Sequence, residues 1–305
     1  MNPDRKKRYM EMKYQSDILP PGSLERLFKK VDSFEKRKGK DCSEFNSKEI
    51  LTFLTMNNDR SLSVIDNRNS MLSNYTDWCL TNGFIKTGQN HYEELTIDDL
   101  KRCLNKEKMK ESVISRNDLL EAIKELQNPR DQFILLGIFE IGVKRHFADL
   151  VNVSIDDFDR ENNVLKLTNR EVIVSDQLCD LAMAANENLI YYDTRNRAVP
   201  LIGDKIIKYT VRGPKSEKDV DDYGKKIIAI VRRNLDYLGL DNMIPRDIAF
   251  SGMIHRIKEY GKYYNLEPRE VVLNKKLYKK VCQQYDVKMY STVFLHQYES
   301  VLSLK

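Results

Sequence analysis

The sequence lacks any apolar run near the roughly 18 residues that a membrane-spanning helix needs. Its first ten residues, MNPDRKKRYM, are charged and no apolar stretch follows them, so a secretory signal is not indicated. The apolar share of 41% and the mean hydropathy of −0.56 are typical of a globular protein in water. We therefore expect a cytoplasmic protein, and 305 residues are enough for about two domains.

Metal-binding and repeat patterns are also missing. The five cysteines include no Cys-x-x-Cys pair and no neighbouring histidine, and the four histidines share no metal-like spacing. No period of 20 to 50 residues recurs, which excludes repeat architectures. We expect neither cofactor nor metal. We also expect reduced, mostly buried thiols at Cys42, Cys79, Cys103, Cys179 and Cys282.

The charges are distributed unevenly along the chain. Residues 1–40 hold 12 Lys and Arg against 6 Asp and Glu, residues 41–202 hold 19 against 27, and residues 203–305 hold 20 against 13. Both ends are therefore basic around an acidic middle, although the net charge is only +5. Such a pattern favours contact with a polyanion, and nucleic acid is the first candidate.

The first half of the chain indicates a basic segment followed by a small helical domain. Residues 1–42 predict a partly mobile basic arm with one short helix over 23–31. Residues 43–106 predict a compact helical domain, with a helix after the Asn46 capping box, a long helix over 61–81, and a capped helix after Thr96. The lysine-rich residues that follow, within 107–114, predict a linker.

The second half, residues 115–286, predicts a larger domain that is mostly helical. Pro129 opens a strongly apolar helix that ends at Gly142, which should lie at the centre of this domain. Residues 164–174 predict a β-hairpin with its turn at 168–169. Further helices are expected over residues 176–188, 217–239, 246–260 and 269–285. The apolar tail at 287–305 should pack against its own domain or against a neighbouring subunit.

This order of elements resembles the tyrosine recombinase, or phage integrase, family. Residues 47–104 look like the core-binding domain of the family, with its terminal Thr-x-Asp-Asp-Leu helix. Residues 129–167 look like the opening of its catalytic domain, and the similarity continues more faintly to about residue 286. The resemblance implies a mainly α fold of two domains, in which the catalytic-like domain carries a small β-hairpin or sheet.

The reaction of this family needs a tyrosine nucleophile, two arginines on the phosphate, a hairpin lysine that protonates the leaving oxygen, and histidines. Where the first arginine belongs, the sequence has Lys144 followed by Arg145, and a lysine cannot form the bidentate contact. The hairpin turn offers Arg170, a poor proton donor, while Lys166 lies on the strand before it.

The remaining positions depart further from the family pattern. Where the family has His-x-x-Arg, this chain has Arg246 and Ala249, and Asn274-Lys275-Lys276 replaces the usual Gly-His or Gly-Trp pair. Tyr285 best matches the nucleophile, with Tyr290 and Tyr298 as weaker matches. Because losing one such donor costs about a hundred- to a thousandfold in rate, we expect negligible catalysis.

Phosphate binding tolerates these substitutions better than catalysis does. The resemblance therefore implies a protein that binds double-stranded DNA sequence-specifically without strand exchange, like the integrase-like repressors that maintain lysogeny in temperate Bacillus phages of the SPbeta group. A homo-oligomer on DNA and an antirepressor protein are further expected partners. The residues predicted to contact DNA are Arg145, Lys166, Arg170, Arg246, Lys275, Lys276, Lys279, Lys280 and Tyr285.

Two other functions are compatible with the sequence. The first is an active recombinase in which Tyr285 attacks DNA with help from Arg145 and Lys166. The second is a protein-interaction module that kept the fold and no longer binds DNA.

Overall fold

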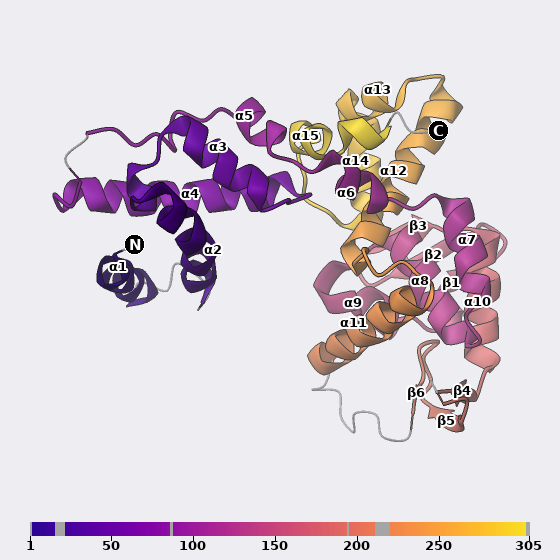
Figure 1. Cartoon of the computed structure of the whole chain (residues 1–305). Helices are drawn as coiled ribbons and strands as arrows, with labels where there is room; N and C mark the ends of the chain where they lie inside the picture. The colour runs from indigo at the N-terminus through magenta and orange to yellow at the C-terminus, as the bar shows by residue number, and fades with distance from the viewer. Residues whose placement is uncertain (1, 16–21, 86–87, 194, 211–219, 303–305) are drawn as a thin grey trace. The chain divides into compact units, whose positions relative to one another are not determined.

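The computed structural model of the chain describes residues 2–15, 22–85, 88–193, 195–210 and 220–302 (Figure 1). Its contacts divide the chain into two compact units, Met1–Met109 and Lys110–Lys305. The short helix α6 (Lys106–Glu111) spans the boundary and overlaps most of its length with the segment predicted as a linker. Among the described residues, no helix is long and apolar enough to cross a membrane.

Unit 1 is built from helices. They are α1 (Pro3–Gln15), α2 (Ser23–Lys38), the 3-10 turn η1 (Cys42–Glu44), α3 (Ser47–Met56), α4 (Leu62–Thr81) and α5 (Ile97–Arg102). The capping boxes at Asn46 and Thr96 form as the sequence predicts, because each side chain accepts a hydrogen bond from the backbone three residues on. The starts of α3 and α5 and the long helix α4 are therefore confirmed.

The described residues of segment 1–42 do not form the partly mobile arm that their charge suggested. Helix α2 places Leu24, Leu27, Phe28 and Val31 at helical spacing, and all four are buried in the same core as the later helices. Helix α1 adds Tyr9 to this core. Most of the basic side chains lie on the exposed faces of these two amphipathic helices.

A buried ion pair also holds these two helices together. The ammonium of Lys6 on α1 contacts the carboxylate of Glu35 on α2, and both side chains are almost fully buried. Glu35 Oε1 also accepts a hydrogen bond from the Cys42 amide at 2.8 Å. Breaking such a pair leaves an uncompensated buried charge, so α1 and α2 form a structural part of unit 1.

Unit 2 is organised around α8 (Pro129–Ile141). Pro129 occupies its first turn, Gly142 ends it with a φ of 100°, and eleven of its residues are buried, as predicted for a central helix. The surrounding helices are α7 (Arg116–Lys124), α9 (Lys144–Asn152), α10 (Asp176–Glu187), α11 (Val220–Tyr237), α12 (Pro245–Tyr264), α13 (Pro268–Leu273), α14 (Lys275–Tyr285) and α15 (Ser291–Leu302).

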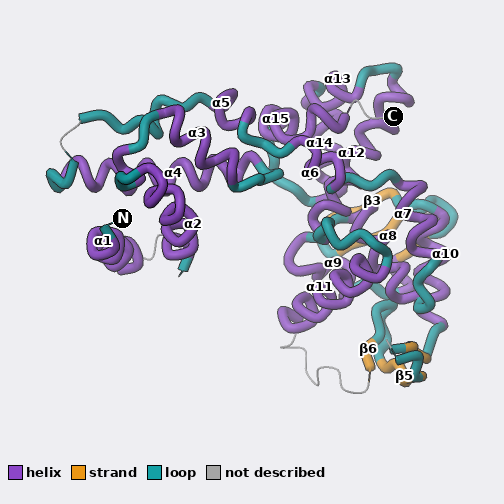
Figure 2. Tube along the Cα trace, viewed as in Figure 1, coloured by secondary structure: helices purple, strands orange, loops and turns teal. Residues whose placement is uncertain are grey.

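Two small antiparallel sheets accompany these helices (Figure 2). The strands β2 (Val164–Leu167) and β3 (Arg170–Ile173) form the predicted hairpin, with Leu167 paired to Arg170, and β1 (Phe158–Asp159) extends it. The second sheet consists of β4 (Ile190–Tyr192), β5 (Ala198–Ile202) and β6 (Tyr209–Thr210). The sequence did not predict it, because its strands are short and carry no regular turn signal.

The C-terminal region differs from the sequence prediction at one place and agrees with one of the two predicted outcomes at another. The helix expected over 269–285 is broken at Asn274, whose side chain caps α14 by accepting hydrogen bonds from the Lys276 and Leu277 amides. The tail forms α15, which buries Phe294 and Leu295 in a core shared with α12 and α14. The described part of the tail thus packs within its own unit.

The cysteines behave as expected from their spacing. All five are free thiols; Cys42, Cys79, Cys103 and Cys179 are buried, and Cys282 is partly buried. Burial is the main cause that raises the pKa of each of the five thiols. None of these thiols is therefore set up as a reactive thiolate.

Candidate nucleic-acid interface

Helix α14 separates its basic and apolar residues onto opposite faces. Its buried face contains Leu277, Tyr278 and Val281. Within the described residues, none of the lysines on the other face has an ion-pair partner, and all of them are exposed. These residues, which we call the lysine face, are Lys275, Lys276, Lys279 and Lys280. Four solvated cations at helical spacing can neutralise successive phosphates.

Tyr285 ends the same helix but points the other way. Its side chain is only 2% exposed. A Cβ atom placed on Gly252 of α12 would lie 1.7 Å from the Phe139 carbonyl oxygen and 2.7 Å from the Tyr285 hydroxyl. The hydroxyl therefore lies beside the close crossing of α8 and α12, inside unit 2.

This position disfavours ionisation of the phenol. Burial is the main cause that raises the pKa of Tyr285, and nearby Glu140 raises it further, while Arg256 opposes the shift. A tyrosine held neutral and covered by protein is neither exposed to DNA nor activated as a nucleophile. We therefore remove Tyr285 from the predicted DNA contacts.

The positions that correspond to the family's His-x-x-Arg lie on the first turns of α12. Arg246 is exposed, its guanidinium lies 5.1 Å from the Phe250 ring, and it has no ion-pair partner in the described part of the chain. Ala249 is buried one turn later. Together with Gly142 and Tyr285, they line a small, mostly apolar pocket of about 160 Å³. The pocket offers one cation at its rim.

Arg170 is occupied by protein partners. Its guanidinium forms ion pairs with Asp149 at 2.7 Å and Asp286 at 3.4 Å. It also donates hydrogen bonds to the carbonyl oxygens of Gln284 and Ile141. With 11% of its side chain exposed, it connects the hairpin to α8, α9 and the end of α14. The structure thus places Arg170 in the fold and not on a DNA-facing surface.

The two remaining predicted contacts are Lys166 and Arg145. Lys166 is exposed on β2, where it is paired in register with Glu171. The backbone of Arg145 belongs to α9, but the side chains of residues 144–146 lie outside the described residues. The structure thus brings Lys166 to the surface and gives no position for the Arg145 guanidinium.

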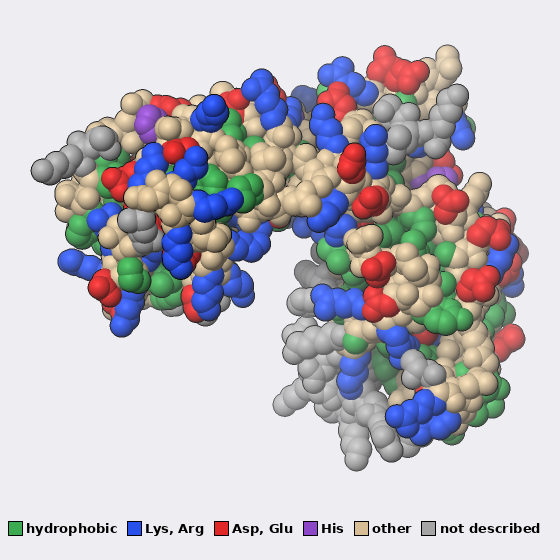
Figure 3. Space-filling view, in the orientation of Figure 1, with side chains coloured by type: hydrophobic (Ala, Val, Ile, Leu, Met, Phe, Trp, Pro, Cys, Tyr) green, Lys and Arg blue, Asp and Glu red, His purple; other side chains and the backbone are tan. Residues whose placement is uncertain are grey.

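Unit 1 has a basic surface of its own. Lys and Arg side chains spread over the face that includes α1 and α2 (Figure 3). Several are paired within their helix, such as Lys29 with Glu25 at 2.8 Å and Lys36 with Asp32 at 2.6 Å. Lys7 and Arg8 are exposed on α1 and have no such partner among the described residues. The positive charge of the predicted arm is thus held on a folded surface.

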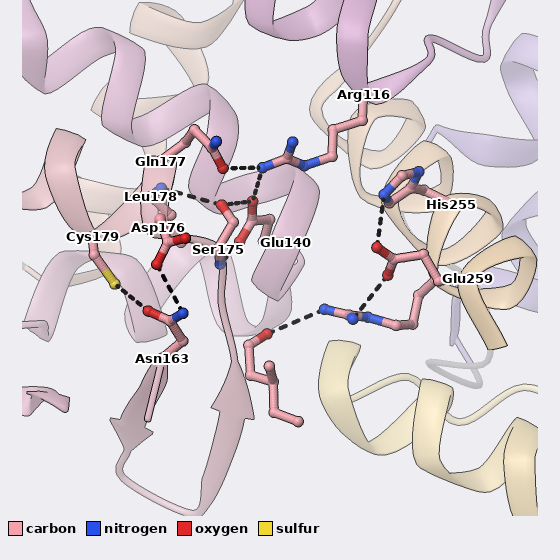
Figure 4. Close-up of polar contacts among 12 residues, drawn as sticks. Arg116, Glu140, Asn163, Ser175, Asp176, Gln177, Leu178, Cys179, His255 and Glu259 are labelled. Carbon is pink, nitrogen blue, oxygen red and sulfur yellow. Dashed lines mark hydrogen bonds and ion pairs between the residues drawn. The ribbon is translucent and has the colours of Figure 1, made fainter. Parts of the chain in front are cut away.

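Sequence reasoning missed a polar cluster in unit 2 in which Arg116, Glu140 and Ser175 meet (Figure 4). Glu140 is buried in α8 and accepts hydrogen bonds from the backbone and hydroxyl of Ser175 at 2.8 and 2.6 Å. Arg116 contacts both Glu140, at 3.4 Å, and Gln177, at 2.9 Å. The only signal in the sequence was an isolated acid within the apolar run of α8.

Helix α12 supplies the other side of this cluster. Glu259 pairs with His255 at 3.3 Å and with Arg256 at 2.8 Å, and these contacts lower its pKa against the effect of burial. Sequence analysis assigned His255 no role. The two sides and Tyr285 line an open pocket of about 370 Å³.

One group in unit 1 has the atom types of a metal site. Ligand atoms of Glu35, Asp41 and Cys42 lie within 4.8 Å of one another. Each carboxylate already has protein partners, because Glu35 pairs with Lys6 and Asp41 accepts two hydrogen bonds from Ser43. The group is therefore explained by the packing of α1 and α2, and it carries no metal assignment.

Two family models match the chain. A family model described as MrpR, C-terminal catalytic domain, matches residues 113–304, and one described as MrpR, N-terminal core-binding domain, matches residues 1–81. The second match includes α1 and α2, consistent with their place in the core of unit 1. No curated protein matches the chain.

Two solved structures are similar to the chain. One is a lambda integrase dimer bound to a COC' core site, with 14% identity, a TM-score of 0.51, and coverage of 96% of this chain and 94% of that chain. The other is XerA recombinase, with 14% identity, a TM-score of 0.40, and coverage of 96% and 92%. The predicted fold class is thus confirmed: the chain has a tyrosine recombinase-like fold with a core-binding and a catalytic-type domain.

Proposed function

The chain belongs to the MrpR family, and from this premise we propose that it binds double-stranded DNA sequence-specifically and does not cut it. The contrast at the two faces of α14 carries this proposal. The lysine face is exposed and unpaired among the described residues, whereas the Tyr285 side chain is buried on the other side. Such a helix can hold phosphates but does not present a nucleophile to them.

The surroundings of Tyr285 support the absence of cleavage. In-line attack on a phosphodiester needs cationic donors that converge on the non-bridging oxygens. Arg246 can supply one such donor, Ala249 supplies none, and Arg170 is held by two carboxylates. With two of these positions unable to contact a phosphate, binding is favoured over chemistry.

Fold similarity supports DNA as the ligand. The similar lambda integrase structure is of a dimer bound to a core site, and this chain carries exposed cations in both units, on α1 and α14. Binding to specific sites without strand exchange suits transcriptional control. We therefore propose a repressor that maintains lysogeny of a temperate phage, acts on operators in the host cytoplasm, and is controlled by oligomerisation or an antirepressor.

The first test is DNA binding by the full chain. Gel shifts against phage intergenic DNA at two salt concentrations should give retarded complexes that weaken steeply at the higher salt, because bound phosphates release counterions. Genome-wide occupancy in a lysogen should then give repeated sites near promoters. The absence of any shift at low salt would leave the protein-interaction module as the better function.

The second test separates a repressor from an active recombinase. A suicide substrate traps the covalent tyrosyl adduct of a recombinase on DNA. We expect no trapped adduct with this protein on the same DNA that it retards. A trapped adduct that disappears in Tyr285→Phe would establish the alternative function, a site-specific recombinase with Tyr285 as its nucleophile.

A further inference from the structure

The outer face of the second sheet in unit 2 is apolar and exposed. Burial alternates along β4 and β5, so that Tyr191 and Leu201 are buried while their neighbours in the strands point outward. The outward residues, which we call the sheet face, are Ile190, Tyr192, Ala198, Pro200 and Ile202. Exposed apolar side chains are usually scattered singly, so five on adjacent strands indicate a surface that binds another molecule.

The β4 edge of this sheet is closed to an added strand. The Asn128 side chain donates a hydrogen bond to the Tyr192 carbonyl oxygen and accepts one from the Tyr192 amide, both at 2.9 Å. The Ile190 amide donates to Asn188 Oδ1 at 2.9 Å. Because side chains occupy these edge groups, a peptide strand cannot pair with them. A partner must therefore lie on the sheet face, where a second sheet can pack.

The charges at the two ends of the sheet face limit which partner fits. Arg195 lies in the turn between β4 and β5, and Asp204 lies just past the end of β5. Both side chains are exposed, and neither has an ion-pair or hydrogen-bond partner among the described residues. The other turn charges, Arg197 and Asp193, pair with each other at 2.6 Å, and Lys205 is partly buried. One end thus offers a cation and the other an anion, as a self-complementary surface requires.

We propose that the sheet face binds the same face of a second copy of this chain, related by a twofold axis. With the axis in the plane of the contact and perpendicular to β5, Arg195 of each copy meets Asp204 of the other. The apolar residues between these pairs pack as in a two-sheet sandwich. A patch on the order of a few hundred Å² per copy gives a total near the roughly 1,000 Å² that a specific interface needs. We therefore expect a weak dimer, with a Kd on the order of 10 μM.

The position of the sheet face leaves the DNA-binding surface of unit 2 accessible. The second sheet lies at the end of unit 2 opposite α13 and α15 (Figure 1). The lysine face belongs to α14, which shares its core with α15. Two joined copies could bind two half-sites, and each would raise the effective concentration of the other. This role deepens the proposed control by oligomerisation and rests on the proposed function, whereas the dimer itself does not.

The first experiment is sedimentation velocity of the full chain without DNA, from about 1 to about 100 μM, a range that includes the expected Kd. The weight-average sedimentation coefficient should rise toward that of a dimer. Ile190→Lys places a charge at the centre of the sheet face and should raise Kd about tenfold, while circular dichroism shows a folded monomer. Ile173→Lys is the matched control, because Ile173 is a 59% exposed isoleucine on β3 of the other sheet. It should leave Kd unchanged.

The second experiment tests the arrangement of the charges. Arg195→Asp and Asp204→Arg should each raise Kd about fivefold, because each places like charges opposite one another at both ends of the contact. The double variant again has opposite charges at both ends, so it should recover most of the affinity of the unchanged protein. A merely structural role of the two residues would not give this recovery.

The proposal is overturned if the chain remains monomeric up to about 100 μM, which would leave a different protein as the occupant of the sheet face. It is also overturned if Ile190→Lys dimerises as tightly as Ile173→Lys, or if the double charge variant dimerises no more tightly than the single variants. Because these assays contain no DNA, they leave the proposed DNA binding untouched. A failure of the gel shifts would likewise leave the dimer standing.

Discussion

Arg170 and Arg246 lie where the resemblance predicts two catalytic residues of a recombinase, the hairpin lysine and the histidine, yet their surroundings are opposite. Arg170 is mostly buried and forms ion pairs with Asp149 and Asp286. Arg246 is exposed and covers the Phe250 ring. The difference shows that a cation at a ligand-binding position can serve the fold instead, and that the other elements packed around it decide which role it has.

The largest expected difference between the two arginines is in stability. Arg170→Ala should lower the free energy of unfolding by on the order of 3 kcal/mol, because it leaves Asp149 partly buried without its cation. Chemical denaturation followed by circular dichroism measures this decrease. Arg246→Ala should leave the unfolding midpoint almost unchanged. Equal effects of the two substitutions would show that the contrast between them is mistaken.

The lysine face should dominate the DNA affinity of unit 2. Replacing Lys275, Lys276, Lys279 and Lys280 together by alanine should weaken operator binding about a hundredfold near physiological salt. The slope of log K against log salt should become shallower by about 0.9 for each phosphate that the variant no longer neutralises. Fluorescence anisotropy at several salt concentrations measures both quantities. Lys29→Ala is the single-residue comparison, because Lys29 lies in unit 1 and is paired with Glu25. Replacing Leu277 would not be a suitable control, because that side chain is buried.

Arg246 should contribute one contact to the same surface. Arg246→Ala should weaken operator binding about tenfold, in keeping with the removal of one charge-assisted hydrogen bond to a phosphate. Arg246→Lys should recover part of the affinity if the contact is mainly electrostatic. Unchanged affinity in the alanine variant would place Arg246 outside the DNA interface and would bring it closer to Arg170 in role.

The smallest expected effect is on Tyr285. Tyr285→Phe should change the free energy of unfolding by less than about 1 kcal/mol, because the hydroxyl has no hydrogen-bond partner among the described residues. Operator affinity should also be unchanged. Thermal unfolding and anisotropy check the two statements. A marked decrease in DNA binding would mean that the hydroxyl reaches the DNA, contrary to its position in the structure.

Local features of the fold were predictable from the sequence. The caps at Asn46 and Thr96, and the boundaries of α8 at Pro129 and Gly142, depend on interactions within one or two turns. The β2–β3 hairpin follows from two short apolar strands around a turn. The break at Asn274 was missed, because the apolar spacing continues through it and only the side-chain cap separates α13 from α14.

The candidate site could be predicted only in part. The lysine face was visible because four lysines share a helical spacing. The direction of Tyr285 depends on the crossing of α8 and α12 at Gly252, and the ion pairs of Arg170 join residues up to 116 positions apart. Neither follows from local pattern. The same applies to α1 and α2. Their charges are evident in the sequence, but the core that they share is not.

Tyr9 and Lys6 of α1 pack against α2, and this packing has a practical consequence for work on the amino-terminal segment. Deleting residues 1–42 would remove part of the core that supports α4. Loss of DNA binding by the deletion variant would therefore reflect an unfolded domain. Substituting the outward-facing Lys7 and Arg8 instead leaves that interior intact. Only such surface changes can tell whether this end of the protein touches the double helix.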